Sequence, residues 1–156
     1  MDFRVSGISI APFKPLFALD EAELLRRGIR QYIADAKPGF PCRVSLEDAE
    51  PGERLLLVNY EHQPEPASPY RASGPIFVRE AADETFNRRN EIPAQLRSRT
   101  LSVRAYDRDA LMVDADVTEG GDLETLIRRF FERSDTAYIH AHFARRGCYA
   151  CRIDRS

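Results

Sequence analysis

The stretch Arg99-Thr-Leu-Ser-Val-Arg-Ala-Tyr106, followed after Asp107-Arg-Asp109 by Ala110-Leu-Met-Val-Asp-Ala-Asp-Val-Thr118, decides the fold class of this chain. In both halves apolar and polar residues alternate, which is typical of strands with one buried face. The short polar connection between them predicts an antiparallel hairpin. An amphipathic helix is predicted after Gly120, because apolar residues recur at helical spacing: Leu123, Leu126, Ile127, Phe130 and Phe131.

Strands and turns dominate the rest of the chain as well. Residues 54–62, Arg-Leu-Leu-Leu-Val-Asn-Tyr-Glu-His, are apolar and aromatic over a strand-like length and give the strongest further strand. Asp20 and Gly28 bracket a predicted short helix, since Asp caps first turns and Gly follows last turns. Residues 81–96 are polar and are predicted to be mostly loop with a helical turn. Further strands are predicted for residues 3–10, 29–36, 42–46, 75–80, 136–143 and 148–153.

These elements predict an α+β fold, with one domain over residues 1–156, a mainly antiparallel β-sheet and two main helices. A domain of this length buries enough surface to fold without disulfides or a structural metal. No Gly-rich loop follows any predicted strand, which excludes a dinucleotide-binding fingerprint and a P-loop. No motif identifies a cofactor, so the cofactor stays unknown.

The composition is that of an ordinary globular protein, with 43% apolar and 31% charged residues. The net charge of −2 argues against a nucleic-acid-binding function, which usually goes with a basic excess. The sequence contains no run of about 18 apolar residues and no secretory signal at its start, so we expect a cytoplasmic protein without a membrane partner. Its three cysteines are an odd number and are predicted to be free thiols.

The candidate functional residues are concentrated near the C-terminus, in Tyr138-Ile-His-Ala-His-Phe-Ala-Arg-Arg-Gly-Cys-Tyr-Ala-Cys151. Residues two apart on a strand share a face, so His140 and His142 line up opposite the apolar face. His62 ends another strand, where it shares a face with Tyr60. We predict that the three histidines are catalytic, with an imidazole that titrates near neutral pH acting as general acid or base.

A metal site is an alternative to this metal-free prediction, because His-x-His on a strand is a common ligand pair and His62 can supply a third ligand. Cys148 and Cys151 form a Cys-x-x-Cys, but residues three apart on a strand point to opposite faces, which argues against a zinc or redox pair. Cys148 alone is a candidate catalytic thiolate, since neighbouring arginines favour the anion. Two buried, inert cysteines are the simpler interpretation.

Arginines and tyrosines near the histidines indicate an anionic ligand. Arg145 and Arg146 lie in a turn, where two guanidiniums and exposed amides can clamp a carboxylate or phosphate. Tyr70 and Arg71 lie in a proline-stiffened loop that follows the strongest strand and can close over the same site. We predict that these four residues and Tyr60 bind a small anionic molecule; a solvated turn and a surface loop are the alternatives.

A third hypothesis belongs to a different class of function. The chain is then an interaction module without catalysis, a homodimer formed through an edge strand or through the helix of residues 123–131. Arg99 and Arg104 lie on the first hairpin strand, but the sequence leaves open which way they face.

Four stretches of the chain carry a family resemblance: Pro41-Cys-Arg-Val-Ser-Leu-Glu-Asp-Ala49, Gly52-Glu-Arg-Leu-Leu-Leu-Val-Asn-Tyr-Glu-His62, Ser68-Pro-Tyr-Arg-Ala-Ser-Gly-Pro-Ile-Phe77 and His140-Ala-His-Phe-Ala-Arg-Arg-Gly-Cys148. They resemble a bacterial family known as domain of unknown function 1203, over most of the chain. In that family an Asn stands more often where this chain has Phe143, and Cys151 is not part of the pattern. The resemblance implies a small single-domain bacterial protein and names no activity.

Overall fold

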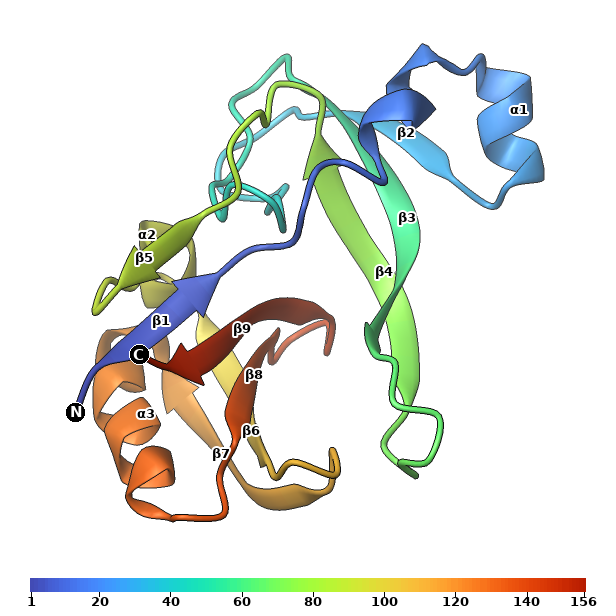
Figure 1. Ribbon diagram of the computed structural model, residues 1–156. Coiled ribbons are helices and arrows are strands. Elements are labelled where there is room, and N and C mark those ends of the chain that lie inside the picture. Colours follow the sequence, from blue (N-terminus) through green and yellow to red (C-terminus); the bar gives the residue numbers. More distant parts are fainter.

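The computed structural model describes residues 1–156 and contains two antiparallel β-sheets and three α-helices (Figure 1). The larger sheet has the strand order β5-β1-β9-β8-β6-β7, and the smaller sheet has the order β2-β3-β4. The predicted α+β class with mainly antiparallel sheet is thereby confirmed. The strands are β1 (Phe3–Ser6), β2 (Arg30–Ile33), β3 (Arg54–Gln63), β4 (Ala72–Arg79), β5 (Asn87–Arg89), β6 (Thr100–Tyr106), β7 (Met112–Glu119), β8 (Tyr138–Phe143) and β9 (Tyr149–Arg155). The helices are α1 (Glu21–Arg26), α2 (Ala94–Arg97) and α3 (Leu123–Glu132), with 3-10 turns at Lys14–Ala18 and Gly120–Asp122.

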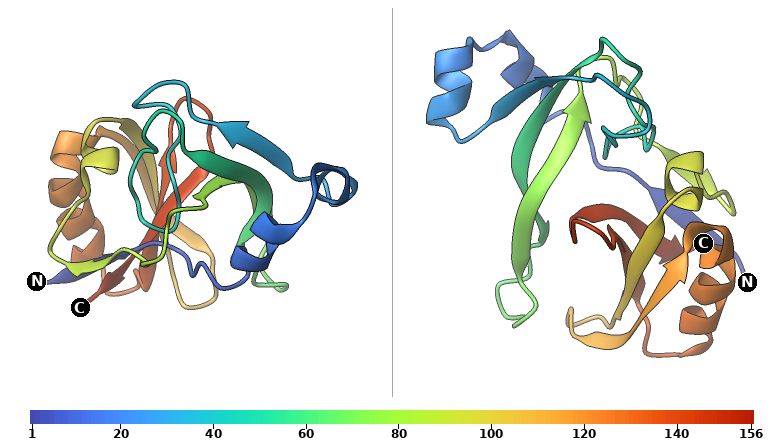
Figure 2. Two further views of the ribbon diagram at one scale, coloured as in Figure 1. Left: turned by 90° about the horizontal axis from the view of Figure 1, so that it is seen from above. Right: turned by 180° about the vertical axis from the view of Figure 1, so that it is seen from behind.

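The predicted hairpin and the helix after it build the main core. Strand β6 pairs with β7 on one side and with β8 on the other, both antiparallel. Alternation along β6 places Leu101, Val103 and Ala105 on one face of the sheet, and α3 covers that face with its apolar side (Figure 2). This cluster also takes in Phe3 and Val5 of β1, so the larger sheet is held together by one apolar core.

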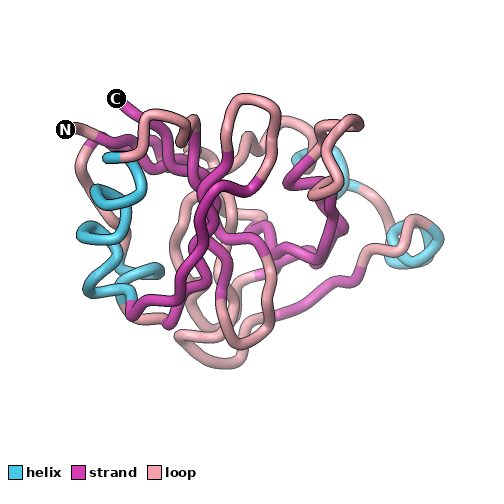
Figure 3. The backbone as a smooth tube through the Cα atoms, turned by 90° about the horizontal axis from the view of Figure 1, so that it is seen from below, coloured by secondary structure: helices cyan, strands magenta, loops and turns pink.

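The smaller sheet packs on the opposite side of the larger one from α3 (Figures 1 and 3). Its long strands β3 and β4 contribute Leu56, Val58 and Val78 to a second apolar cluster, which reaches the larger sheet through Tyr149 of β9. As a result the larger sheet is covered on both faces around β8, and all six residues of β8 are buried. Strands covered on both faces lack a solvent side, which sets the environment of every side chain on β8.

The helix predicted near the N-terminus begins where expected. The Asp20 carboxylate accepts a hydrogen bond from the Glu23 amide at 2.8 Å and caps the first turn of α1. The strand predicted after this helix is β2, which forms an edge of the smaller sheet. None of the helices combines the length and the apolar content that crossing a lipid bilayer requires.

Two predicted segments differ from the structure. Residues 42–46 form no strand, because only Cys42 makes a single bridge, to Phe77, and Leu46 has a φ of 52°, which lies outside the extended region. Residues 81–96 contain the helical turn α2, but also the strand β5. That strand is three exposed polar residues paired with β1, so it has no apolar alternation by which the sequence reveals it.

Candidate functional site

Strand β8 carries two histidines on the face that α3 does not cover. Ile139, Ala141 and Phe143 belong to the main core, and His140 and His142 project from the opposite side of the strand, as the pleat predicts. That side is not open to solvent, however, because His140 is only 2% exposed and His142 only 1%. Both imidazoles lie beneath the smaller sheet.

Strand β3 of the smaller sheet brings the third histidine. The pairing of β3 with β4 shifts register between Tyr60 and Gln63, a β-bulge that contains His62. The His62 ring centroid lies 5.0 Å from that of His142 and 6.2 Å from that of His140, and the latter two centroids are 6.5 Å apart. The structure therefore brings together three residues that are far apart in sequence, which we call the histidine cluster.

Tyrosines enclose the histidine cluster. Tyr149 of β9 stacks on His62 with a centroid distance of 5.3 Å and meets His140 edge-on at 5.2 Å. Tyr106 and Tyr138 each lie 5.2 Å from His140 on its other side. Aromatic walls of this kind exclude water and strengthen every electrostatic interaction inside them.

Strand β6 adds a cation to the histidine cluster. Arg104 is the register partner of His140, and its Nη1 lies 3.4 Å from Nε2 of His142. Its Nε donates a hydrogen bond to the Ser102 hydroxyl at 3.4 Å. Arg104 takes part in none of the ion pairs of the structure. A half-buried guanidinium without a carboxylate leaves the centre of this site with an excess of positive charge.

The backbone fixes the protonation pattern of His142. Its Nδ1 lies 3.1 Å from the carbonyl oxygen of Gly147, and because a carbonyl only accepts, Nδ1 carries the proton. In the neutral ring Nε2 then has a free lone pair, which accepts from Arg104. His142 is thus held as a neutral acceptor between a carbonyl and a guanidinium.

Burial keeps all three imidazoles of the histidine cluster uncharged at neutral pH. Desolvation first, and then the charges of the nearby His142 and Arg152, lower the pKa of His140 to about 2. Desolvation, followed by the charge of Arg104, lowers the pKa of His142 to about 4, and the same two causes lower the pKa of His62. His140 and His142 therefore differ from the expected imidazole that titrates near neutrality, because the enclosing sheets remove them from water.

Two ring nitrogens of the histidine cluster have no partner. Nδ1 of His62 and Nδ1 of His140 are buried and make no hydrogen bond. A buried polar atom without a partner costs about 1–3 kcal/mol, so each such atom needs an explanation. The chain has two others away from the cluster, Gln95 Oε1 and Thr136 Oγ1. No group of three or more His, Cys, Asp or Glu side chains is arranged to hold a metal ion, which gives the alternative of a metal site no support.

Cys148 lies beside a buried arginine. Nη2 of Arg43 donates to the Cys148 sulfur at 3.0 Å, and Nε of Arg43 donates to the carbonyl oxygen of Tyr149 at 2.8 Å. Arg43 is only 1% exposed, and burial lowers its pKa. All three cysteines are free, as predicted. Burial raises the pKa of Cys151 to about 12, so the partly exposed Cys148 is the thiol of this pair that a reagent can reach.

The predicted tyrosine ligands lie at the edge of the histidine cluster. Tyr60 is partly buried and packs against Tyr149 at a centroid distance of 5.8 Å. Tyr70 is 41% exposed and meets Tyr106 edge-on at 6.1 Å. Both rings therefore reach the cluster through another tyrosine rather than directly.

The predicted arginine ligands are exposed. Arg71 forms an ion pair with Glu61 at 3.3 Å on the smaller sheet. Arg145 and Arg146 lie in the turn between β8 and β9 and form no ion pair or side-chain hydrogen bond. Two arginines lie beside the buried histidines: Arg104, whose Nη1 is 3.4 Å from Nε2 of His142, and Arg152 of β9, a register partner of His140. After burial and Arg104, the charge of Arg43 is a minor cause of the lowered pKa of His142.

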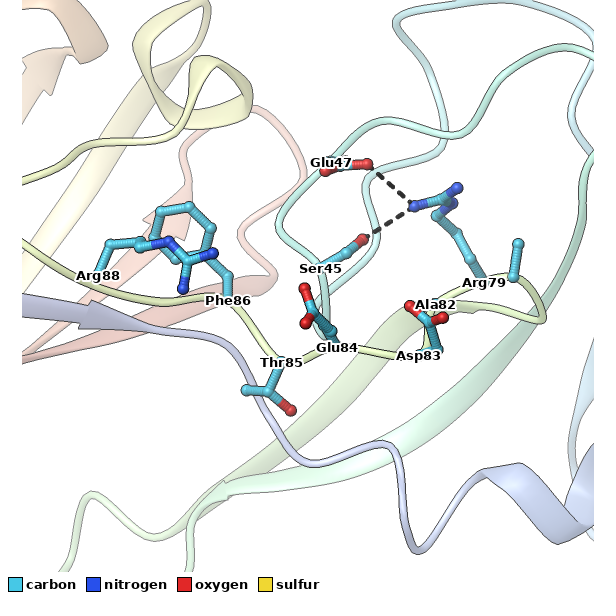
Figure 4. Close-up of a pocket in the computed structure, with 10 residues that line it drawn as sticks. Ser45, Glu47, Arg79, Ala82, Asp83, Glu84, Thr85, Phe86 and Arg88 are labelled. Carbon is cyan, nitrogen blue, oxygen red and sulfur yellow. Dashed lines mark hydrogen bonds and ion pairs between the residues drawn. The ribbon is translucent and has the colours of Figure 1, made fainter.

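Two surface hollows lie away from the histidine cluster. One, of about 260 Å³, is bordered by Ser45, Glu47, Arg79 and residues 81–86 (Figure 4). There Arg79 donates to the Ser45 hydroxyl at 3.1 Å and pairs with Glu47 at 3.2 Å, so its charge is already satisfied. The other, of about 480 Å³, lies between α2 and residues 45–48. Neither hollow is lined by a histidine, so neither opens onto the cluster.

A comparison with known families agrees with the resemblance seen in the sequence. A family model described as protein of unknown function (DUF1203) matches residues 39–155. The chain belongs to this family. The matched part contains the three histidines, Arg104 and Cys148, and therefore the whole of the cluster described above. No curated protein and no solved structure matches the chain.

The sequence analysis did not predict the residues that join the site through strand pairing and sheet packing. Arg104 and Tyr106 alternate with core residues of β6, so strand parity places them opposite the core, but only the pairing of β6 with β8 sets them beside His140. Arg43 falls in a segment wrongly predicted as a strand. Tyr149 lies within the predicted last strand, and its stacking on His62 depends on how the two sheets pack.

Proposed function

We propose that this protein binds a small anionic molecule at the histidine cluster, with Arg104 as the anion-binding group. The observation that carries the proposal is the guanidinium of Arg104, which has no carboxylate partner and lies among three uncharged imidazoles. A charge taken partly out of water needs a counter-charge or several hydrogen bonds. The guanidinium of Arg104 makes only two long hydrogen bonds, to Ser102 and His142. A bound anion supplies the missing counter-charge and further hydrogen bonds.

The imidazoles suit a ligand that both donates and accepts hydrogen bonds. His142 is held as an acceptor at Nε2, and the free Nδ1 atoms of His62 and His140 offer further polar contacts. Neutral imidazoles add no positive charge, so the electrostatic attraction for the anion comes from Arg104, and the rings contribute hydrogen bonds. A carboxylate or phosphate with a neighbouring hydroxyl group matches this combination.

His62 is the group that we assign to acid–base work, if the bound molecule is also transformed. It is partly exposed, whereas His140 and His142 are almost completely buried. Protonating the buried rings is unfavourable because desolvation and Arg104 oppose the positive charge. His62 can therefore exchange a proton with the ligand, and the other two rings orient it.

The test is anion binding followed through the imidazole resonances. Inorganic phosphate and acetate are titrated into the protein at pH 7.5, and the nitrogen shifts of the three histidines are recorded by NMR. Arg104→Gln is expected to weaken binding by about 10- to 100-fold, the range for losing a charge-assisted hydrogen-bonding group. The matched control is Arg108→Gln, which removes an exposed arginine from the turn between β6 and β7 and is expected to leave the affinity unchanged.

Two outcomes would contradict the proposal. If neither anion shifts the imidazole resonances at millimolar concentration, the cluster is not an anion site. If the paired substitutions Arg145→Gln and Arg146→Gln abolish binding and Arg104→Gln does not, the anion sits on the exposed turn instead.

A further inference from the structure

Two rings of the histidine cluster, His140 and His142, are closed to solvent in this structure, so a ligand cannot reach them without a movement of the protein. His140 and His142 are buried under the smaller sheet, and Tyr149, Tyr106 and Tyr138 close their remaining sides. If the site takes an anion, as proposed above, some part of this cover has to move. Such a movement is useful to the protein only if the proposed anion-binding function holds. It can be tested without any ligand.

The part of the cover nearest the cluster is the tip of the β3–β4 hairpin, residues 61–73. This tip folds as a unit: the Ser68 amide donates to the Glu65 carbonyl, the Arg71 amide to the Ser68 carbonyl, and the Tyr70 amide to the Ser68 hydroxyl. The tip carries three prolines, whose fixed φ further limits its internal freedom. A segment stiffened in this way moves as one body rather than unravelling.

The base of the tip is the weakest part of the hairpin. Tyr60 pairs with Gly74, and beyond that pair the register shifts before Gln63 pairs with Ala72. A bulge leaves one residue unpaired and bends its strand, and a glycine opposite adds conformational freedom. An added Cβ at Gly74 meets nothing within 4 Å, so the chain there is not locked by neighbours.

Hydrogen bonds and ring contacts fasten the tip to the larger sheet. The Ser68 hydroxyl donates to the carbonyl oxygen of Ala110, at the turn between β6 and β7, at 2.7 Å, and Ser68 is 5% exposed. The Gln63 amide donates to the Tyr138 hydroxyl at 2.9 Å. The Tyr70 ring meets Tyr106 edge-on. His62 adds ring contacts to Tyr149, His140 and His142. The attachments come from four of the 13 residues of the tip: His62, Gln63, Ser68 and Tyr70.

We propose that residues 61–73 form a lid that swings about the Tyr60–Gly74 pair, carries His62 with it, and opens the histidine cluster when the Ser68–Ala110 hydrogen bond breaks. Closed, the lid places His62 against His142 and excludes water. Open, it uncovers His140, His142 and Arg104 without unfolding the main core, because none of residues 61–73 belongs to that core.

Chemical labelling in the absence of ligand tests the lid. Diethyl pyrocarbonate acylates neutral imidazole, and peptide mass mapping of the full-length protein at pH 7 gives a separate rate for each histidine. Labelling of Cys151 by a thiol reagent, measured in parallel, reports global unfolding, because Cys151 lies fully buried in the main core. The lid predicts that His140 is modified faster than Cys151 and with a weaker dependence on urea, since local opening exposes little surface.

The variant Ser68→Ala releases the fastening, and Ser73→Ala is its control because Ser73 is exposed and makes no side-chain hydrogen bond. Ser68→Ala is expected to raise the labelling rates of His140 and His142 about fivefold, the factor for one hydrogen bond of average strength. The rate of Cys151 rises by a similar factor, because global unfolding breaks the same bond, so the weaker urea dependence of His140 is what separates the lid from global unfolding. Ser73→Ala should match the wild type. The lid is refuted if His140 and Cys151 show the same dependence on urea, or if Ser68→Ala leaves His140 unchanged. Neither result decides the outcome of the anion titration, which tests the proposed function separately.

Discussion

Strand β8 is buried on both faces, and the two faces have opposite chemistry. On β8, Ile139 is fully buried under α3, and His140 is 2% exposed under the smaller sheet. The face toward α3 is apolar, whereas the face toward β3 carries His140 and His142. These two meet His62 of β3 and Arg104, which has no carboxylate partner, and two of the ring nitrogens there are unpaired. Because burying polar groups without partners lowers stability, the first face holds the fold together and the second is retained at some cost to it.

The largest loss of stability is expected from a substitution in the apolar core under α3. Phe130 of α3 is fully buried in the main core, so Phe130→Ala removes apolar contact and leaves a cavity. We expect the free energy of unfolding to fall by about 3–5 kcal/mol. Urea unfolding followed by circular dichroism at pH 7.5 measures the loss. A fall below about 1 kcal/mol would mean that the core face does not carry the stability of the sheet.

Lowering the pH should weaken the polar face selectively. His140 and His142 have pKa values of about 2 and about 4 in the folded protein, below the ordinary value of 6.5, so the unfolded chain binds more protons between these limits. Their contribution to stability is complete above pH 6.5 and is lost as the pH falls toward the folded pKa values. Two such groups lower the free energy of unfolding by about 2–3 kcal/mol between pH 7.5 and 5.5. Most carboxylates titrate only below this range. Urea unfolding at pH 7.5, 6.5 and 5.5 measures this slope.

A neutral replacement separates the histidines from other titrating groups. His140→Gln cannot take up a proton, so we expect it to reduce the slope of stability against pH over this range by about half. His142→Gln should act similarly. A slope that is the same in the wild type and in both variants would show that the buried rings are not the groups that titrate.

Much of the fold was predictable because the strands and the main helix show a regular alternation of apolar and polar residues in their own sequence. The hairpin of β6 and β7, the helix α3 and the strand β3 each carry a clear apolar period, and each was predicted close to its observed place. The segment of residues 42–46 was predicted wrongly because its apolar residues are buried by packing under the sheets rather than by strand pairing. The strand β5 was missed because exposed polar residues pair through the backbone alone.

The site was predictable only in part, and for a different reason. Pleat parity places His140 and His142 opposite the core, but parity does not reveal whether the second face of a strand is open or covered. The turn with Arg145 and Arg146 follows the histidines in sequence but points to solvent, whereas Arg104 reaches His142 through strand pairing. Proximity in sequence was therefore a poorer guide than register, which depends on long-range pairing.

The smallest effect is expected at the hydrogen bond that joins the two sheets on the polar face. Tyr138→Phe removes the hydroxyl that accepts from the Gln63 amide and leaves a buried amide without that partner. We expect a loss of about 1 kcal/mol in the free energy of unfolding, well below that of Phe130→Ala. Tyr70→Phe is the control, because the Tyr70 hydroxyl makes no hydrogen bond and its ring is partly exposed. If the two Tyr→Phe variants are equally stable, the Gln63–Tyr138 contact contributes nothing, and the smaller sheet is held on the larger one by its apolar cluster and its other contacts.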